Sequence, residues 1–239
     1  MNVRSHQLLA TFIAVACLTS SVHSQIKAAP LTSRSPEQQF PRISGLAPKI
    51  VQDQVNALLA KRESQDLDKR KECLDSGMPN SPQPTYDETI RTVYLSPHLL
   101  SIDVRASWTG CTSYPVVGMT EPLTIDLSKG AALNWRSFFI DGFFESRTAQ
   151  GSPITQLYLH HADLTPECNA IVNKPLTEYI LWLDSQTGLM IRPALPHATQ
   201  SCSKLVSIPF SKIKEQVNPV LRRDLPASIR PANPSSQLP

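Results

Sequence analysis

One stretch of the chain alternates strictly between apolar and polar residues. Its apolar members are Leu100, Ile102, Val104, Ala106 and Trp108. Successive side chains of a β-strand point to opposite faces, so this spacing predicts a strand with one buried face and one solvated face. The preceding segment 89–95 is rich in β-forming residues, and the turn Ser96-Pro97-His98 lies between the two. The two segments are therefore predicted to form an antiparallel hairpin.

The rest of the sequence supplies further strands and several helices. Alternation and turn signals predict strands at 123–127, 179–183, 189–191 and 205–208. Helical spacing predicts helices at 48–77, 134–144, 154–172 and 209–217. Strands in hairpins with helices before and between them predict an α+β fold, an antiparallel sheet built from hairpins with helices packed on one face.

The first 24 residues have the composition of a secretory signal peptide. Arg4 precedes an apolar run over 8–17, and small residues follow up to Ser24, where cleavage is expected. The run is too short to span a bilayer, and no later run is long enough, so no transmembrane segment is expected in the mature chain. The predicted location is periplasmic or secreted. The alternative is a lipoprotein anchored through Cys17, because the residues before it resemble a lipobox.

Composition divides the remaining chain into three parts. Residues 25–37 are predicted to be a flexible leader, 38–220 a single α+β domain, and 221–239 a disordered tail rich in proline and serine. Without Arg4 the chain holds 22 Lys and Arg against 20 Asp and Glu. This near balance gives no electrostatic reason to expect a nucleic-acid partner.

Four cysteines remain after the signal peptide, namely Cys73, Cys111, Cys168 and Cys202. An even number in an exported chain predicts two disulfides, and four cysteines allow three connectivities. One arrangement joins Cys73 to Cys111 and Cys168 to Cys202. Cys111 as a nucleophile is the weaker interpretation, because it follows a strand, whereas reactive thiols gain from a helix start or an adjacent base.

No motif for catalysis, a metal or a cofactor is present. His160 and His161 are adjacent and so point to different faces, and the serine-hydrolase and phosphate-loop signatures are absent. The mixed charges of 61–72 and the carboxylate pairs at 66 and 68 and at 87 and 88 are interpreted as solvated surface. Trp108 and Tyr114 flank an irregular loop and are the candidate binding residues, with core packing as their alternative role.

Several short stretches together resemble a known bacterial family. They are Phe40-Pro-Arg-Ile-Ser-Gly45, Tyr94-Leu-Ser-Pro-His-Leu-Leu-Ser-Ile-Asp-Val104, Thr124-Ile-Asp-Leu-Ser-Lys-Gly130, Asn134-Trp-Arg-Ser-Phe-Phe139 and Val206-Ser-Ile-Pro-Phe-Ser211. The family is the extracellular α+β domain, of unknown function, shared by the lysozyme-sensing anti-sigma factor and the accessory domain of a peptidoglycan deacetylase. The resemblance implies this fold and a cell-envelope setting. Many members carry a Gly-Ala-His or Gly-Ala-Tyr segment where this chain has Gly110-Cys-Thr-Ser-Tyr114. A ligand that relatives bind through that segment is therefore not expected to bind this chain.

Two hypotheses about function follow. The first is an exported, periplasmic, non-catalytic binding protein that recognises a cell-envelope protein or peptidoglycan component through a sheet face or the loop at 109–118. The second is a cell-wall-active hydrolase with an unrecognised catalytic arrangement. Its members would be His98, Asp103, Arg105 and Ser107, which surround one hairpin.

Overall fold

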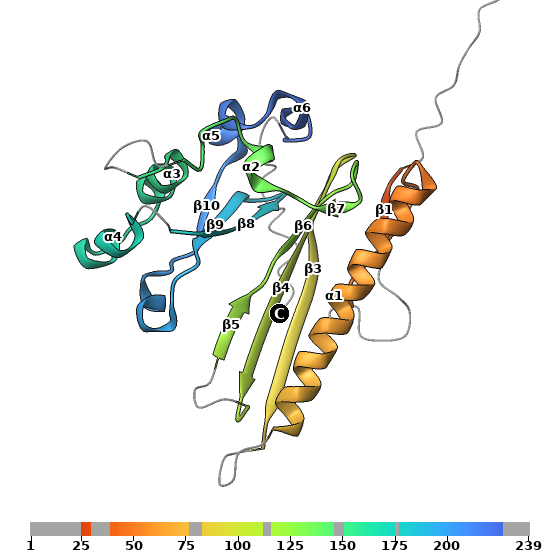
Figure 1. Cartoon of the computed structure of the whole chain (residues 1–239), viewed down its shortest axis with the longest axis horizontal. Coiled ribbons are helices and arrows are strands. Elements are labelled where there is room, and N and C mark those ends of the chain that lie inside the picture. The colour runs from red at the N-terminus through yellow and green to blue at the C-terminus, as the bar shows by residue number, and fades with distance from the viewer. Residues whose placement is uncertain are drawn as a thin grey trace, which may run out of the picture.

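The computed structural model describes residues 25–29, 39–76, 83–111, 116–145, 151–174 and 177–226. These residues form antiparallel sheets together with one long helix and several short ones, so the predicted α+β class is confirmed. The long helix lies along the larger sheet, and the short helices gather around a smaller sheet (Figure 1).

The larger sheet contains the predicted hairpin. Its strands are β3 (Thr85–Leu95), β4 (Leu99–Thr109), β5 (Val116–Thr120), β6 (Leu123–Asp126) and β7 (Ala131–Ala132). They are ordered β3-β4-β6-β7, and β5 pairs with β4 beyond the end of β6. The hairpin of β3 and β4 closes where the Ser96 N–H donates to the Leu99 carbonyl at 2.8 Å. β3 begins at Thr85 rather than at 89, and this added length contributes to the site described below.

The long helix α1 (Lys49–Asp75) covers one face of the larger sheet. In its first half Val55 and Leu59 are fully buried against Leu100 and Ile102 of β4. The Asn56 side chain brackets Ile43 of β2 (Arg42–Ser44), accepting from its N–H at 2.8 Å and donating to its carbonyl at 3.0 Å. Apolar packing and these two hydrogen bonds fix the N-terminal half of the helix.

The opposite face of β4 is solvated only in part, because Arg105 is exposed while the first half of the face is buried. Ser101 and Asp103 are 0% and 1% exposed. The smaller sheet covers Ser101, whose hydroxyl accepts a hydrogen bond from the Leu183 N–H at 3.1 Å. Asp103 is held by Arg91 at 3.0 Å and Arg105 at 2.9 Å. Alternation identifies the two faces of a strand, but the tertiary fold decides what covers each of them.

The smaller sheet has the order β10-β9-β8 and carries the second core. Its strands are β8 (Tyr179–Asp184), β9 (Gly188–Pro193) and β10 (Val206–Ile208). The surrounding helices are α2 (Trp135–Phe138), α3 (Pro153–His161), α4 (Pro166–Val172), α5 (Phe210–Ile213) and α6 (Pro219–Arg222), with 3-10 helices η2 (His197–Cys202) and η3 (Lys214–Gln216). Phe138, Tyr158 and Phe210 are buried in this core. The single helices predicted at 134–144, 154–172 and 209–217 are therefore shorter or divided.

Both ends of the described chain take part in the fold. Within the expected flexible leader, β1 (Lys27–Ala29) pairs with β2, and Ile26 and Ala28 pack against the first core. Near the expected tail, α6 extends past residue 220, and Asp224 accepts from the Tyr94 hydroxyl and bonds His98 at 2.9 Å. Residues 1–24, with Cys17, and residues 227–239 lie outside the described residues. Within the described ranges, no helix combines the length and apolar character that crossing a membrane requires.

Candidate ligand-binding cleft

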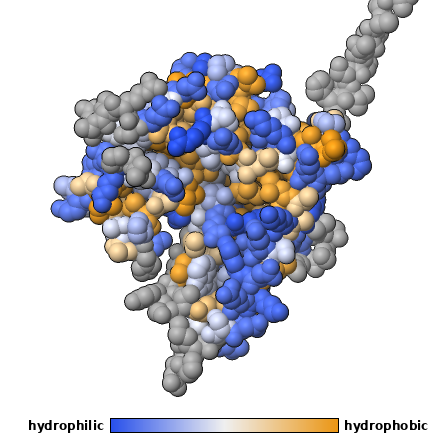
Figure 2. All heavy atoms as spheres, in the orientation of Figure 1, coloured by the Kyte–Doolittle hydropathy of each residue, from blue (hydrophilic) through white to orange (hydrophobic). Residues whose placement is uncertain are grey.

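A pocket of about 330 Å³ lies between the C-terminal half of α1 and the strands β3, β4 and β5. It exists because the helix changes character after Leu59. The residues that follow on the same helical face, at spacings of three and four, are Arg62, Asp66, Lys69 and Cys73. Charged side chains thus replace the apolar stripe where the helix faces the sheet. Figure 2 shows hydrophilic residues along this half of α1, in the lower part of the view.

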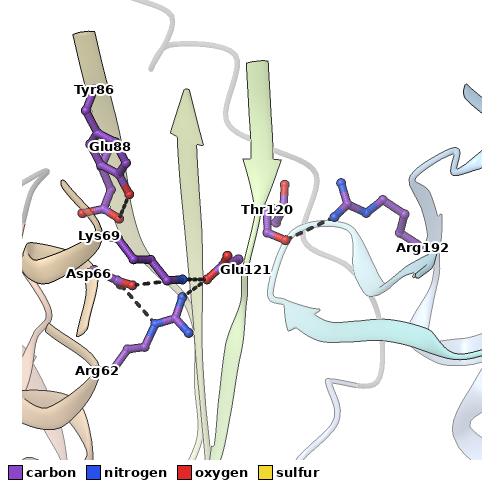
Figure 3. A network of polar contacts seen from close by, with 8 residues as sticks. All are labelled: Arg62, Asp66, Lys69, Tyr86, Glu88, Thr120, Glu121 and Arg192. Atoms are coloured by element: carbon purple, nitrogen blue, oxygen red, sulfur yellow. Dashed lines mark hydrogen bonds and ion pairs between the residues drawn. The ribbon is translucent and has the colours of Figure 1, made fainter. Parts of the chain in front are cut away.

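An ion-pair network forms one wall of the cleft (Figure 3). The Arg62 guanidinium donates to Asp66 at 3.1 Å and to Glu121 at 2.5 Å, and the Lys69 ammonium donates to Glu121 at 2.6 Å. Burial raises the pKa of Asp66, which is only 3% exposed, and the nearby Arg62 opposes this shift. Burial acts in the same direction on Glu121, but hydrogen bonds from Lys69 and Arg62 outweigh it and lower its pKa. Asp66 and Glu121 therefore have cationic partners within the protein.

Glu88 on β3 is different, because no described residue forms an ion pair with it. Its carboxylate accepts a long hydrogen bond of 3.4 Å from the Tyr86 hydroxyl. No lysine or arginine among the described residues forms an ion pair with it. Burial, helped by the nearby charge of Asp66, raises the pKa of the Glu88 carboxyl to about 7. The carboxyl group lines the cleft and changes its charge near neutral pH.

Two aromatic side chains line the cleft beside Glu88. Tyr86 of β3 and Trp108 of β4 stand directly opposite each other in the hairpin register. Their ring centroids are 5.9 Å apart and their planes differ by 7°. Trp108 is partly exposed, whereas Tyr86 is 8% exposed. The structure thus brings Trp108, one of the two predicted binding residues, into the cleft, while Tyr114 lies outside the described residues.

The structure contains two disulfides, with the pairing that the sequence allowed as one of three. Cys73 is bonded to Cys111 with their Cα atoms 4.7 Å apart, and Cys168 is bonded to Cys202 with a separation of 5.0 Å. The first bond ties the C-terminal end of α1 to the end of β4 and lines the cleft. Because the sulfur atom of Cys111 is part of a disulfide, the residue has no free thiol that could act as a nucleophile.

The four residues considered for a hidden hydrolase are not brought together as a catalytic group. Asp103 is bonded to Arg91 and Arg105, and His98 is bonded to Asp224. A nucleophile activated by a neighbouring base would require Ser107 and His98 to be in contact, yet the two lie toward opposite ends of the long strand β4. Across the ranges described, no group of three or more His, Cys, Asp or Glu residues could hold a metal ion.

The sequence interpretation missed the charged residues of the cleft. Of the four carboxylates interpreted as solvated, Asp68 and Asp87 are exposed, but Asp66 is buried and Glu88 is partly buried. The interpretation failed because mixed charges on a helix usually lie in solvent. The signal that could have identified Asp66 was its spacing from Leu59, which places it on the packed face. For Glu88 the signal was its alternation with Tyr86 and Ile90.

No protein-family model matches this sequence, and no curated protein matches it. Among solved structures, the chain is similar to a DUF3298 family member from Bacteroides fragilis, with 12% identity and a TM-score of 0.49, covering 84% of this chain and 94% of that one. It is also similar to a DUF3298 family protein from Pseudomonas aeruginosa, with 12% identity and a TM-score of 0.48, covering 82% of this chain and 95% of that one. These neighbours belong to a family of unknown function, and the link to the anti-sigma factor and the deacetylase stays a prediction.

Proposed function

We propose that this chain is an exported, non-catalytic binding protein of the cell envelope, and that its cleft recognises a peptidoglycan component or an envelope protein. The observation that carries the proposal is the cleft, which combines two aromatic rings with the carboxyl group of Glu88, for which the described residues supply no ion-pair partner. Ligand sites typically combine an apolar wall with a few polar groups that fix orientation. The two disulfides support export, because such bonds persist in oxidising compartments.

Export predicts a defined mature N-terminus. If the first 24 residues are a cleaved signal peptide, sequencing of the protein recovered from the envelope fraction should start at Gln25. A lipid-modified N-terminus at Cys17 would instead support the alternative of a lipoprotein. An intact Met1 on the mature protein would contradict export by this route.

The binding role predicts a large effect of Trp108→Ala. Loss of an aromatic anchor at a binding site costs about 2 kcal/mol, so retention on purified peptidoglycan sacculi should weaken about thirtyfold. Leu95→Ala is the matched control, since Leu95 is 38% exposed on the same hairpin and lies away from the cleft. Sedimentation of each variant with sacculi measures the effect. Equal retention of the two variants would reject the cleft as the binding site.

One observation favours the alternative of a cell-wall hydrolase. A carboxyl group with a pKa of about 7, such as Glu88, suits general acid catalysis. The carboxylate that acts on it electrostatically, Asp66, is bonded to Arg62 and buried, which disfavours a nucleophilic role. Release of soluble fragments from sacculi by the wild type, lost in Glu88→Gln, would establish hydrolysis in place of simple binding.

A further inference from the structure

The described residues that line the cleft include more acidic than basic side chains. Among the described residues, the charged side chains that line it are Asp66, Glu72, Glu88 and Glu121 and the cation Lys69. Lys69 and Arg62 bond Glu121, and Arg62 also bonds Asp66. Glu72 is exposed to solvent. Glu88 remains as a partly buried carboxyl group that faces the cavity without a cation to pair with among the described residues.

No described residue on the elements around Glu88 forms an ion pair with its carboxylate. On α1, Asp66 opposes the ionised form of Glu88, while Arg62 and Arg70 favour it from beyond ion-pair distance. On β3, the Tyr86 hydroxyl donates only the long hydrogen bond of 3.4 Å. Across the cleft, Lys69 and Arg62 bond Glu121 rather than Glu88. A buried carboxylate in such surroundings is stabilised by a cation that enters from outside.

The wall beside Glu88 suits the uncharged part of such a cation. Val104, Ala106 and Trp108 stand on one face of β4, at alternate positions, and line the same cavity. Apolar side chains there can cover a short aliphatic or ring body, and an aromatic ring also attracts a nearby ammonium group. The ammonium group of the ligand would then lie near the carboxylate, and its carbon body along β4.

We infer that the cleft binds a small organic ligand that carries a protonated primary amine, with Glu88 as the residue that accepts hydrogen bonds from the ammonium group. This inference rests on the proposed binding function and narrows its ligand. In peptidoglycan, such an amine would be the side-chain ammonium of a diamino acid in the peptide. The chemistry is that of a lysine-like side chain, with an aliphatic stem and a terminal charge.

The binding should depend on pH in a defined direction. Glu88 loses its charge as the pH falls through about 7, whereas a primary amine stays protonated up to about pH 10. The affinity for the amine is therefore expected to be highest above pH 7 and to fall about tenfold between pH 8 and pH 6. In Glu88→Gln this dependence should disappear.

The test uses two probes, one with a side-chain ammonium group and one in which acetylation has removed its charge. Nα-acetyl-lysine amide keeps the side-chain ammonium, and its Nε-acetyl form lacks it. Titrations of the purified mature protein at pH 8, followed by NMR or calorimetry, should give binding of the first probe at least about tenfold tighter than binding of the second. Glu88→Gln should lose this preference. Asp87→Asn should keep it, because Asp87 is the exposed neighbour on the other face of β3.

Thermal unfolding shows whether the variants fold. Glu88 has a raised pKa in the folded state, so its ionisation destabilises the fold as the pH rises from the unfolded-state value to about 7. Glu88→Gln removes this penalty and is therefore expected to be at least as stable as the wild type at pH 8. Equal affinity for both probes, or an unchanged preference in Glu88→Gln, would overturn the inference.

Sacculi treated with acetic anhydride, which acetylates free amines, separate this inference from the proposed function. Weaker retention of the wild type on acetylated sacculi than on untreated sacculi supports an amine ligand. Equal retention that still depends on Trp108 overturns the amine inference and leaves the binding function standing. No retention on either material, together with no response to the lysine probe, overturns the inference and the peptidoglycan-binding function together.

Discussion

Replacing Gly188 with alanine is expected to lower the free energy of unfolding by about 3–5 kcal/mol. Gly188 begins β9 with a φ of 110°, a conformation that residues with a Cβ atom rarely adopt. An added Cβ atom would lie 2.1 Å from the Ile208 carbonyl oxygen and 2.9 Å from the Pro209 Cα atom. Both contacts are with backbone, so relief would require β10 to move away from the turn that joins β8 to β9. Urea denaturation followed by circular dichroism measures the change.

Gly130→Ala is the matched control for this prediction. Gly130 also has a positive φ, of 66°, but an added Cβ atom there would mainly meet the Gln54 side chain, at 2.7 Å. The Gln54 amide group can rotate away, the contact with the Gln54 Cβ atom at 2.9 Å requires a small shift of the helix, and the φ of 66° lies in the small left-handed region that residues with a Cβ atom can adopt at modest cost. The expected loss is therefore about 1–2 kcal/mol. Equal losses in the two variants would show that the close approach of Ile208 does not determine the stability of the hairpin.

Removing the Cys73–Cys111 disulfide is expected to cost about 4 kcal/mol of unfolding free energy in the chain-entropy model, because the bond closes a loop with a sequence separation of 38 residues. The double variant Cys73→Ala with Cys111→Ala should also lose ligand affinity, since this bond fixes the end of α1 against β4 beside the cleft. Denaturant titration measures the first effect, and sedimentation with sacculi measures the second.

The second disulfide supplies the control. Cys168 and Cys202 have a sequence separation of 34 residues, so their replacement by alanine should destabilise the fold by nearly the same amount. They join α4 to η2, away from the cleft, and ligand affinity should remain. If both double variants lost affinity equally, binding would depend on global stability rather than on the position of α1.

The sequence was most informative where one simple periodicity dominates. Strict alternation from Leu100 to Trp108 predicted β4 and its hairpin with β3, and the stripe at Val55 and Leu59 predicted the start of α1. An even number of cysteines indicated two disulfides, and only the fold identified the pairs. These features depend on local spacing or on whether the number of cysteines is even, and neither requires knowledge of distant contacts.

The cleft could not be predicted in the same way. Arg62, Asp66 and Lys69 follow one another in a run of mixed charge that is typical of a solvated helix, and only the opposing strands bury Asp66 on this face. The ion pairs to Glu121 join residues more than fifty positions apart. The position of Trp108 opposite Tyr86 depends on the register of the hairpin, which shifts at an irregularity between Thr92 and Tyr94. Each of these features is set by tertiary pairing.

The attachment of α1 at both ends has a further consequence for recognition. Apolar packing at Val55 and Leu59 holds one end, and the sulfur bridge at Cys73 holds the other. The width of the cavity is thereby set before any partner arrives, so the site is preorganised. A small ligand of the proposed kind would then give up little conformational entropy of the protein on association, so few contacts would suffice for binding.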